Sequence, residues 1–298
     1  MANARPTILL TGARGQLGRE LAAVLQATGD IVACDRSMLD LADASMIVRV
    51  VREVAPRLIV NAAAYTGVDR AETERDAAYA INARAPGVLA DEAKRAGAVL
   101  IHYSTDYVFD GHRSAPYDES APTHPLNVYG ESKREGERAI AASGALAVTL
   151  RTSWVYARHG QNFLVTMQRL AATRSELRVV ADQTGVPNWS RAVARATARL
   201  VAQGTPYLAE RAGLYHLSAR GSATWYDFAR AIIGDDARVR VTPITTGDYP
   251  TPAARPAYGV LDATRFERTF GFGLPDWQRL LQECLSGPAE PPLRPRVH

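Results

Sequence analysis

The stretch Thr7-Ile-Leu-Leu-Thr-Gly-Ala-Arg-Gly-Gln-Leu-Gly18 decides the fold. A short apolar run ends in Gly12, Gly15 and Gly18 and leads into an amphipathic segment, Leu17 to Thr28. A glycine loop between a strand and a helix brings backbone N–H groups and the positive helix end against a diphosphate, and a side chain at a glycine position would block that approach. Glycines also simply make turns, but this context favours a dinucleotide-binding loop.

Short apolar runs alternate with helical periods after this loop. The apolar runs are Ile31 to Cys34, Leu58 to Asn61, Val99 to Ser104 and Ala147 to Thr152. The longest helical pattern covers Ala71 to Gly97, with one possible break. Such alternation is typical of a parallel sheet that is covered on both faces. We therefore predict an α/β fold, with a Rossmann-type doubly wound parallel sheet over residues 1–155.

The alternation becomes irregular and proline-rich beyond residue 155. Leu177 to Ala181 and Leu214 to Leu217 are predicted to be strands that return to the main sheet, within about 176–218. Residues 219–285 then form mainly a smaller C-terminal substrate-binding lobe, and the Pro-rich residues 286–298 form a flexible tail. Because ligands of open α/β sheets bind at the carboxyl ends of the strands, we expect the site between the two lobes.

Composition excludes several functional classes. The net charge is +4, but the basic residues are dispersed among acids, so we predict no nucleic-acid partner and consider a small phosphorylated ligand more suitable. Cys34 and Cys284 are too few for a disulfide framework. Since there is no signal-peptide pattern and no apolar run long enough to cross a bilayer, we expect no membrane contact and a cytoplasmic location.

Asp35 stands at the end of the second apolar run, where an acidic residue would accept the adenosine ribose hydroxyl. That position favours NADH. However, Arg36 follows immediately and Arg14 lies inside the glycine loop, so guanidinium groups are also available for the 2′-phosphate of NADPH. The sequence leaves the choice between NADPH and NADH open. Asp40-Leu41 would lie beside the adenine, although Asp40 also suits an acidic cap of the next helix.

Only two of the 35 basic residues other than histidine are lysines, and one of them, Lys133, follows Tyr129 by four residues. In a helix that opens near Tyr129, the least charged stripe contains Tyr129, Lys133, Gly136 and Ile140. A helix buries its least charged stripe, so Lys133 is predicted to face the sheet. Burying a lysine costs free energy, so a buried lysine is expected to have a function. The alternative is a surface lysine, whose apolar stem packs on the protein while its amine reaches water.

Proton transfer explains why Tyr129 and Lys133 stand one helical turn apart. A nearby ammonium favours the phenolate of Tyr129 and brings its proton exchange closer to neutral pH. Lysine can also donate to ribose hydroxyls where the wide arginine fork would crowd the space. A third member is expected in Ser104-Thr-Asp-Tyr-Val-Phe-Asp-Gly111, after a strand end. Thr105 is favoured for this role, and Ser104 is the alternative.

The motifs resemble the extended short-chain dehydrogenase/reductases, and within them the dTDP-4-dehydrorhamnose reductase family. They occur in family order over nearly the whole chain. The matching segments are TGARGQLGREL, LIVNAAAYTGVDRAE, HYSTDYVFDG, PLNVYGESKREGE, LRTSWVYARHGQNFL, VADQTGVP, GLYHLSARGSATWYDFA and YPTPAARPAYGVLD.

This resemblance implies hydride transfer from NAD(P)H to the C4 ketone of dTDP-4-dehydro-L-rhamnose, the last step of dTDP-rhamnose biosynthesis. It implies that Tyr129 protonates the developing alkoxide, that Lys133 holds the nicotinamide ribose, and that Thr105 tunes the proton donor. For the cofactor, it implies that Gly15, Gln16 and Leu17 line the diphosphate. It implies that Asp35 contacts the adenosine ribose, and Asp40 and Leu41 the adenine. Ala64, Tyr65 and Thr66 would contact the middle of the dinucleotide.

For the nucleotide-sugar substrate, the resemblance implies contacts from Asp106, Trp154 and Arg255. Asp106 would approach the sugar and Trp154 would form an aromatic wall, although Trp154 would also suit the core. Arg255 would neutralise the substrate diphosphate.

One feature departs from the family, some of whose members hold a magnesium ion at a dimer contact through several glutamates. Glu20 matches one such position, but Arg191 stands where another carboxylate would be. A cation does not suit a cation site, so we predict no metal. A monomer and a homodimer both remain open. The functional alternatives are another nucleotide-sugar epimerase or dehydratase of this superfamily, and a non-catalytic regulatory subunit with the same fold.

Overall fold

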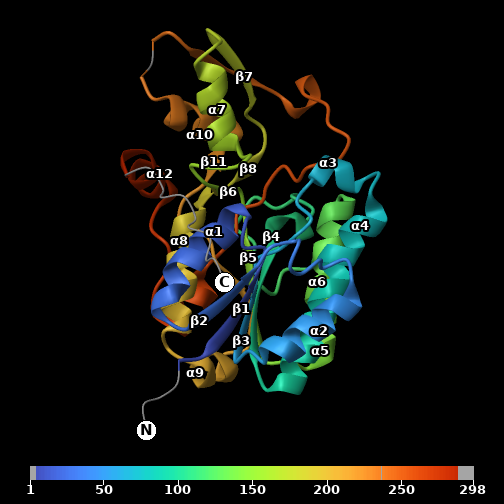
Figure 1. The fold of residues 1–298 in the computed structure, drawn as a ribbon. Coiled ribbons are helices and arrows are strands. Elements are labelled where there is room, and N and C mark those ends of the chain that lie inside the picture. Colours follow the sequence, from blue (N-terminus) through green and yellow to red (C-terminus); the bar gives the residue numbers. More distant parts are fainter. Residues whose placement is uncertain (1–4, 236, 288–298) are drawn as a thin grey trace.

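A six-stranded parallel sheet forms the centre of the computed structural model, which describes residues 5–235 and 237–287 (Figure 1). The strand order is β10, β5, β4, β3, β1, β2, and every neighbouring pair is parallel. The strands are β1 (Thr7–Thr11), β2 (Asp30–Cys34), β3 (Leu58–Asn61), β4 (Val99–Thr105), β5 (Ala147–Thr152) and β10 (Gly213–His216). The predicted Rossmann-type fold and its first five strands are confirmed.

Helices cover both faces of this sheet (Figure 1). One layer contains α1 (Gln16–Val24) and α8 (Ser190–Val201), and the opposite layer contains α2 (Ala44–Val54), α5 (Ala85–Ala96) and α6 (Val128–Ser143). Because the sheet is covered twice, β3, β4 and β5 are buried at every residue. This burial explains why their sequences read as continuous apolar runs.

The chain changes direction in the sheet at β1. It runs from β1 to β2 at one edge and then returns to β3 on the other side of β1. In a doubly wound sheet, such a reversal opens a crevice at the carboxyl ends of the two central strands. The loops after β1, β3 and β4 therefore converge on one region.

The predicted helix over residues 71–97 is interrupted near its centre. It consists of α3 (Val68–Ala71), α4 (Arg75–Tyr79), a π-helical turn η2 (Ala80–Arg84) and α5. Asn82 in this turn bonds the backbone nitrogen of Tyr65 at 2.8 Å and the hydroxyl of Ser132 at 3.1 Å. The π-helical turn thus ties the loop after β3 to helix α6, consistent with the frequent occurrence of π-turns at functional sites.

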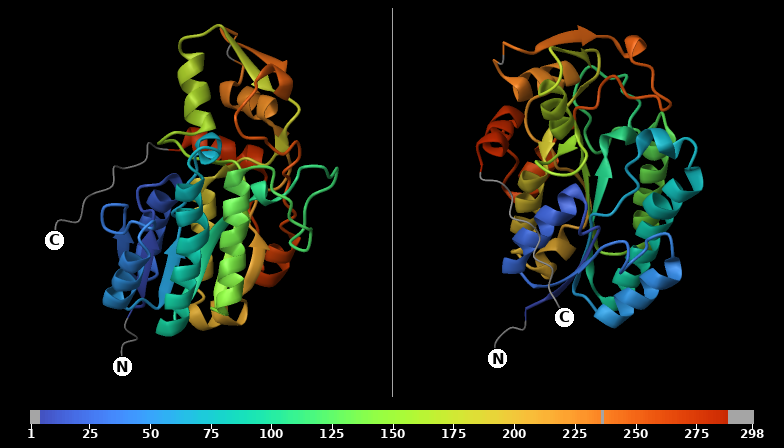
Figure 2. Two further views of the ribbon diagram at one scale, coloured as in Figure 1. Left: turned by 90° about the vertical axis from the view of Figure 1, so that its right-hand side faces the viewer. Right: turned by 45° about the horizontal axis from the view of Figure 1, so that its top comes forward.

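A smaller lobe lies over the carboxyl ends of the sheet (Figure 2). Its helices are α7 (Phe163–Ala171) and α10 (Trp225–Ile233), and its longest strand pair is β7 (Glu176–Val180) with β12 (Arg240–Ile244). Short elements connect it to the core: β6 (Val155–Tyr156) with β9 (Asn188–Trp189), β8 (Thr184–Gly185) with β11 (Ala223–Thr224), and η4 (Thr246–Asp248).

The predicted return of residues 177–181 to the main sheet is wrong, because β7 pairs with β12 in the lobe. The reason is visible in its burial pattern, in which exposed and buried residues alternate from Glu176 to Val179. A strand inside a doubly covered sheet is buried on both faces. The second expected strand, over 214–217, is confirmed as β10 beside β5.

The segment 219–285 does not belong to the lobe alone. Helix α11 (Thr264–Phe270) packs beside β10, where the rings of Phe270 and Tyr215 are 4.9 Å apart. The remaining elements are α9 (Thr205–Glu210), α12 (Trp277–Ser286), η1 (Leu25–Ala27) and η3 (Asp106–Val108). Of the predicted flexible tail, residues 288–298 lie outside the described residues. Within the described part of the chain, no helix is long and apolar enough to span a membrane.

A buried ion pair joins helix α6 to the sheet. Arg151 on β5 is 3% exposed and donates to both carboxylate oxygens of Glu137, at 2.8 and 2.6 Å. The same carboxylate accepts the hydroxyl of Ser104 on β4. This pair fixes the buried face of α6, which carries Lys133, against β4 and β5.

We expect Glu137→Ala to lower the free energy of unfolding by about 3–5 kcal/mol, because the buried Arg151 guanidinium loses its partner. Urea denaturation followed by circular dichroism measures the change. Glu135→Ala on the exposed face of the same helix, where Glu135 pairs with Arg134 and Arg138, is the control and costs less than about 1 kcal/mol. Equal losses in the two variants would contradict the structural role of the Glu137 pair.

Candidate active site

A cavity of about 1470 Å³ lies between the sheet and the lobe. Core residues line one side, and Phe163 and Trp225 from α7 and α10 line the other, so a cavity lies where the site is expected. The predicted cofactor residues that line the cavity are Gly12, Gly15, Gln16, Leu17, Asp35, Arg36, Asp40, Leu41, Ala64, Tyr65, Thr66, Tyr129 and Lys133. Gly18 does not line it.

The glycine loop leaves a backbone surface open toward this cavity. Gly12 has a φ of +69°, and a Cβ atom on it would lie 2.7 Å from the backbone of Ala63. A Cβ atom on Gly18 would lie 2.0 Å from the Gly12 oxygen, so Gly18 permits the close packing of α1 on the loop. Helix α1 begins after Gly15 without a side-chain cap. Its first N–H groups therefore suit a diphosphate, and this cradle fits a dinucleotide.

Charged side chains gather where the adenosine end of a dinucleotide would lie. Asp35 accepts hydrogen bonds from Ser37, and its second carboxylate oxygen lies 2.7 Å from Arg14 Nε. The Ser37 hydroxyl and then the Arg14 charge hold the pKa of Asp35 below its usual value. Arg36 is exposed beside it and lies 3.6 Å from Asp40. A ribose hydroxyl and a 2′-phosphate would both meet this group of side chains.

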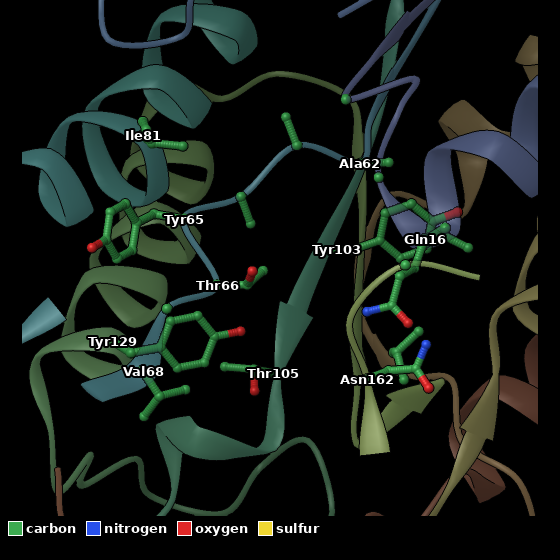
Figure 3. Close-up of a pocket in the computed structure, with 18 of the residues that line it drawn as sticks. Gln16, Ala62, Tyr65, Thr66, Val68, Ile81, Tyr103, Thr105, Tyr129 and Asn162 are labelled. Atoms are coloured by element: carbon green, nitrogen blue, oxygen red, sulfur yellow. The ribbon is translucent and has the colours of Figure 1, made fainter. Parts of the chain in front are cut away.

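The hydroxyl of Tyr129 points toward Thr105 inside the cavity (Figure 3). Asn127 caps the helix that carries Tyr129, and its side chain accepts from the Gly130 N–H. Burial raises the pKa of Tyr129 to about 12, the hydrogen bond with Thr105 lowers it, and the charge of Asp106 raises it further. Thr105 is thus a neighbour that lowers the phenol pKa in this arrangement.

Thr105 and its competitor Ser104 have different partners. The Ser104 hydroxyl donates to Glu137 on α6. Thr105 accepts the Tyr107 N–H at 3.2 Å and donates to Asp106 at 3.0 Å. Of the two residues, Thr105 is the one that the Tyr129 hydroxyl faces.

Lys133 is buried as its helical stripe predicts, with 2% of its surface exposed. Its Nζ donates to the Tyr103 carbonyl at 2.6 Å and lies 3.3 Å from His102 Nε2. Burial lowers the pKa of Lys133 to about 8, and the charge of Glu137 acts in the opposite direction. Lys133 still lines the cavity.

Asp106 and Trp154 line the cavity on the substrate side. Asp106 is 2% exposed and its Oδ2 atom has no hydrogen-bond partner, while burial raises its pKa to about 7. Trp154 has a φ of +41°, a strained conformation for a large side chain. Its ring stacks on Trp225 at 3.5 Å and contacts Gly185, where a Cβ atom would lie 2.4 Å from the indole. These contacts hold the aromatic wall in place.

Arg255 is not brought to the cavity, contrary to the expectation for the substrate diphosphate. Its guanidinium forms two bonds with Asp69, at 3.0 and 2.8 Å, and also bonds Thr251 and the Ala253 carbonyl. These bonds, to Asp69 on α3 and to its own loop, explain why the side chain does not extend toward the strand ends.

Sequence reasoning missed part of the lining. The missed residues include Tyr103, Ser153, His159, Gln161, Asn162, Phe163 and Trp225. Figure 3 shows Tyr103 and Asn162 within the pocket. Most of them follow β5, so the rule that ligands bind beyond the carboxyl ends of strands was the signal that could have found them. Trp225 carries no such signal, because it belongs to the lobe.

Glu20 and Arg191 form an ion pair, with Nε and Oε2 2.9 Å apart. The arginine that stands in place of a carboxylate thus contacts the glutamate directly. Within residues 5–235 and 237–287, no group of three His, Cys, Asp or Glu side chains is arranged to hold a metal ion.

The parallel sheet, the glycine cradle, and Tyr129 with the buried Lys133 define an NAD(P)-dependent oxidoreductase of the extended short-chain dehydrogenase/reductase class. The family model described as the RmlD substrate binding domain matches residues 6–288, and the chain belongs to this family of dTDP-4-dehydrorhamnose reductases.

Individual relatives agree with this assignment. The dTDP-4-dehydrorhamnose reductase of Burkholderia thailandensis is 45% identical over 93% of this chain and 97% of its own length. The Escherichia coli K12 enzyme of the same name is 43% identical over 94% of this chain and 98% of its own length. The crystal structure of the Bacillus anthracis reductase in complex with NADP is 37% identical, with a TM-score of 0.89, over 94% of this chain and 99% of that one.

We expect Asp35→Ala to change the ratio of kcat/KM for NADH and NADPH by about tenfold in favour of NADPH. The substitution removes a charged acceptor for the ribose hydroxyl and a charge that repels the 2′-phosphate. Steady-state kinetics with both cofactors measure the ratio. Asp118→Ala is the matched control, because Asp118 forms the same turn with Ser120 outside the cavity. An unchanged ratio for Asp35→Ala would exclude the proposed role of Asp35 in cofactor choice.

Thr105→Val is expected to lower kcat for ketone reduction by about tenfold or more, since a higher pKa makes the Tyr129 phenol a weaker acid. Thr105→Ser keeps a hydroxyl and should retain most of the activity. The rate is followed by loss of reduced-cofactor absorbance. Equal activity of the valine and serine variants would show that the hydroxyl is not needed.

Proposed function

We propose that this chain reduces the C4 ketone of dTDP-4-dehydro-L-rhamnose to dTDP-L-rhamnose with NADPH or NADH, the last step of dTDP-rhamnose biosynthesis. The observation that carries the proposal is that Tyr129, Lys133 and Thr105 line the same cavity as the glycine loop. A proton donor thus stands where a nicotinamide and a ketone can meet.

The bound nicotinamide supplies the hydride. Tyr129 donates its phenolic proton to the oxygen that becomes negative as the ketone is reduced. Thr105 makes this phenol a stronger acid when its hydroxyl proton turns from Asp106 to the phenolate oxygen. Lys133 would hold the ribose hydroxyls of the bound cofactor, and its ammonium would supply a buried positive charge close to the reaction.

The nucleotide-sugar binds between the core and the lobe. Trp154 and Trp225 provide a stacked aromatic surface for its apolar faces, and the unpartnered Oδ2 of Asp106 is available to sugar hydroxyls. We assign substrate binding mainly to the lobe, with Trp225 on α10 as its contribution. Arg255 contributes only if its bonds to Asp69 open.

Two other functions predict different chemistry. A nucleotide-sugar epimerase or dehydratase returns the hydride to its substrate, so it shows no net cofactor consumption. Tyr107 follows Asp106 where a dehydratase would place the second residue of an acidic pair, which disfavours elimination. A regulatory subunit does not need the catalytic pair. Stoichiometric loss of NADPH absorbance with the keto-sugar distinguishes the reductase from both.

The substrate and the cofactor are both soluble metabolites, so we place the reaction in the cytoplasm. The catalytic residues named above all come from one chain, so the proposed chemistry is compatible with a monomer and with a homodimer.

Tyr129→Phe removes the proton donor and leaves the ring, and we expect kcat to fall by about 10² to 10⁴-fold. Stopped-flow or steady-state loss of NADPH absorbance gives the rate. Tyr79→Phe is the control, since the Tyr79 hydroxyl bonds Glu131 and does not line the cavity. Unchanged turnover in Tyr129→Phe would refute the role of this tyrosine as the general acid.

A further inference from the structure

A row of buried polar side chains runs from strands β1, β3 and β4 to Lys133 on α6. Asn61 at the end of β3 contacts Thr11 on β1, with its Oδ1 2.7 Å from the Thr11 hydroxyl. Its Nδ2 lies 3.0 Å from His102 Nδ1 on β4. His102 Nε2 in turn lies 3.3 Å from Lys133 Nζ. Asn61 and His102 are 1% and 0% exposed, so water does not screen this row.

The backbone determines which way the Asn61 amide points. The N–H of Ala63 can only donate, and its nitrogen is 3.3 Å from Asn61 Oδ1. The oxygen of the amide therefore faces Ala63, and the NH₂ group faces His102. Because an amide NH₂ can only donate, His102 Nδ1 must accept.

The tautomer of His102 follows from this geometry. Burial and the charge of Lys133 keep the pKa of His102 well below its usual value, so the ring is neutral. With Nδ1 accepting, the single ring proton is on Nε2 and faces Lys133 Nζ. An ammonium has no lone pair for this N–H, whereas a neutral amine can accept it.

The other groups around Lys133 do not cancel this effect. Strand β4 also presents the Tyr103 carbonyl, which accepts a hydrogen bond from Nζ at 2.6 Å in either form of the lysine. Helix α6 presents the Tyr129 phenol and the Glu137 carboxylate. Glu137 favours the ammonium, but Arg151 on β5 already binds both of its oxygens. His102 is thus the contact that distinguishes the amine from the ammonium.

We propose that Asn61 and His102 are positioning residues for the catalytic lysine: Asn61 sets the His102 tautomer, and the Nε2–H of His102 stabilises Lys133 as a neutral amine after it has given up a proton. The proposal rests on the proposed function, in which Tyr129 loses its phenolic proton in each turnover. An N–H bond of the Lys133 ammonium then breaks, and a proton reaches the Tyr129 phenolate within the cavity. The resulting amine accepts the His102 N–H until solvent returns a proton.

The chain contains only Lys94 and Lys133, which makes the lysine directly measurable. Protein labelled with ¹⁵N at the lysine Nζ and at the histidine ring has two lysine signals, and the exposed Lys94 is an internal reference. We expect the His102 ring to carry its proton on Nε2. In His102→Gln, whose amide oxygen can accept from an ammonium, the Lys133 titration midpoint should rise by about one pH unit or more relative to Lys94.

His216→Gln is the matched control, because His216 is also a buried neutral imidazole but lies on β10, beside Arg151 and not beside Lys133. Its Lys133 midpoint should stay at the wild-type value. The basic limb of the pH profile of kcat should move upward in His102→Gln, with little change in KM for the nucleotide-sugar.

Three results would overturn the proposal: a proton on Nδ1 of His102 in the wild-type protein, an unchanged Lys133 midpoint in folded His102→Gln, or an equal rise in His216→Gln. The tautomer measurement uses the wild-type chain, so it remains decisive if the variant does not fold. If Lys133 responds as expected but no ketone is reduced, the proposed function fails and the coupling of His102 to Lys133 stands.

Discussion

The burial of one ammonium group beneath the cavity is the constraint on which the rest of the site depends. Lys133 is 2% exposed, and its Nζ is held by the Tyr103 carbonyl at the carboxyl end of β4. This bond and the ion pair of Glu137 with Arg151 fix α6 against the sheet. As a result, Tyr129, one helical turn earlier, is directed at Thr105, the last residue of β4.

The cofactor-binding loops lie beside the catalytic residues because the backbones after β1 and β3 approach each other closely. The loops after β1 and β3 lie so near each other that Gly12 cannot carry a side chain against Ala63. Asn82 in the π-helical turn then binds the backbone of Tyr65 and the hydroxyl of Ser132 on α6. The diphosphate cradle, the middle of the dinucleotide site and the catalytic helix are therefore joined by direct contacts, which suits the positioning that a hydride transfer requires.

Tyr129 and Lys133 have different electrostatic surroundings in the site. Burial raises the phenol pKa to about 12, and Thr105 is a neighbour that lowers it. Lys133 faces His102 on its other side and has a pKa near 8. The two groups thus have separate tasks, since the phenol stays protonated as an acid and the lysine can exchange a proton near neutral pH.

The sequence by itself determined the features that depend on local periodicity and backbone sterics: the five core strands, the glycine loop, and the buried stripe that contains Lys133. Only the tertiary structure decided which distant side chains meet. In the tertiary structure Arg255 binds Asp69, and the strand at 176–180 lies in the lobe. Trp225 stacks on Trp154. His102 lies between Asn61 and Lys133. The physical reason is that helical and strand periods specify which face a residue occupies, whereas its partner on that face comes from another segment, whose position depends on the packing of the whole chain.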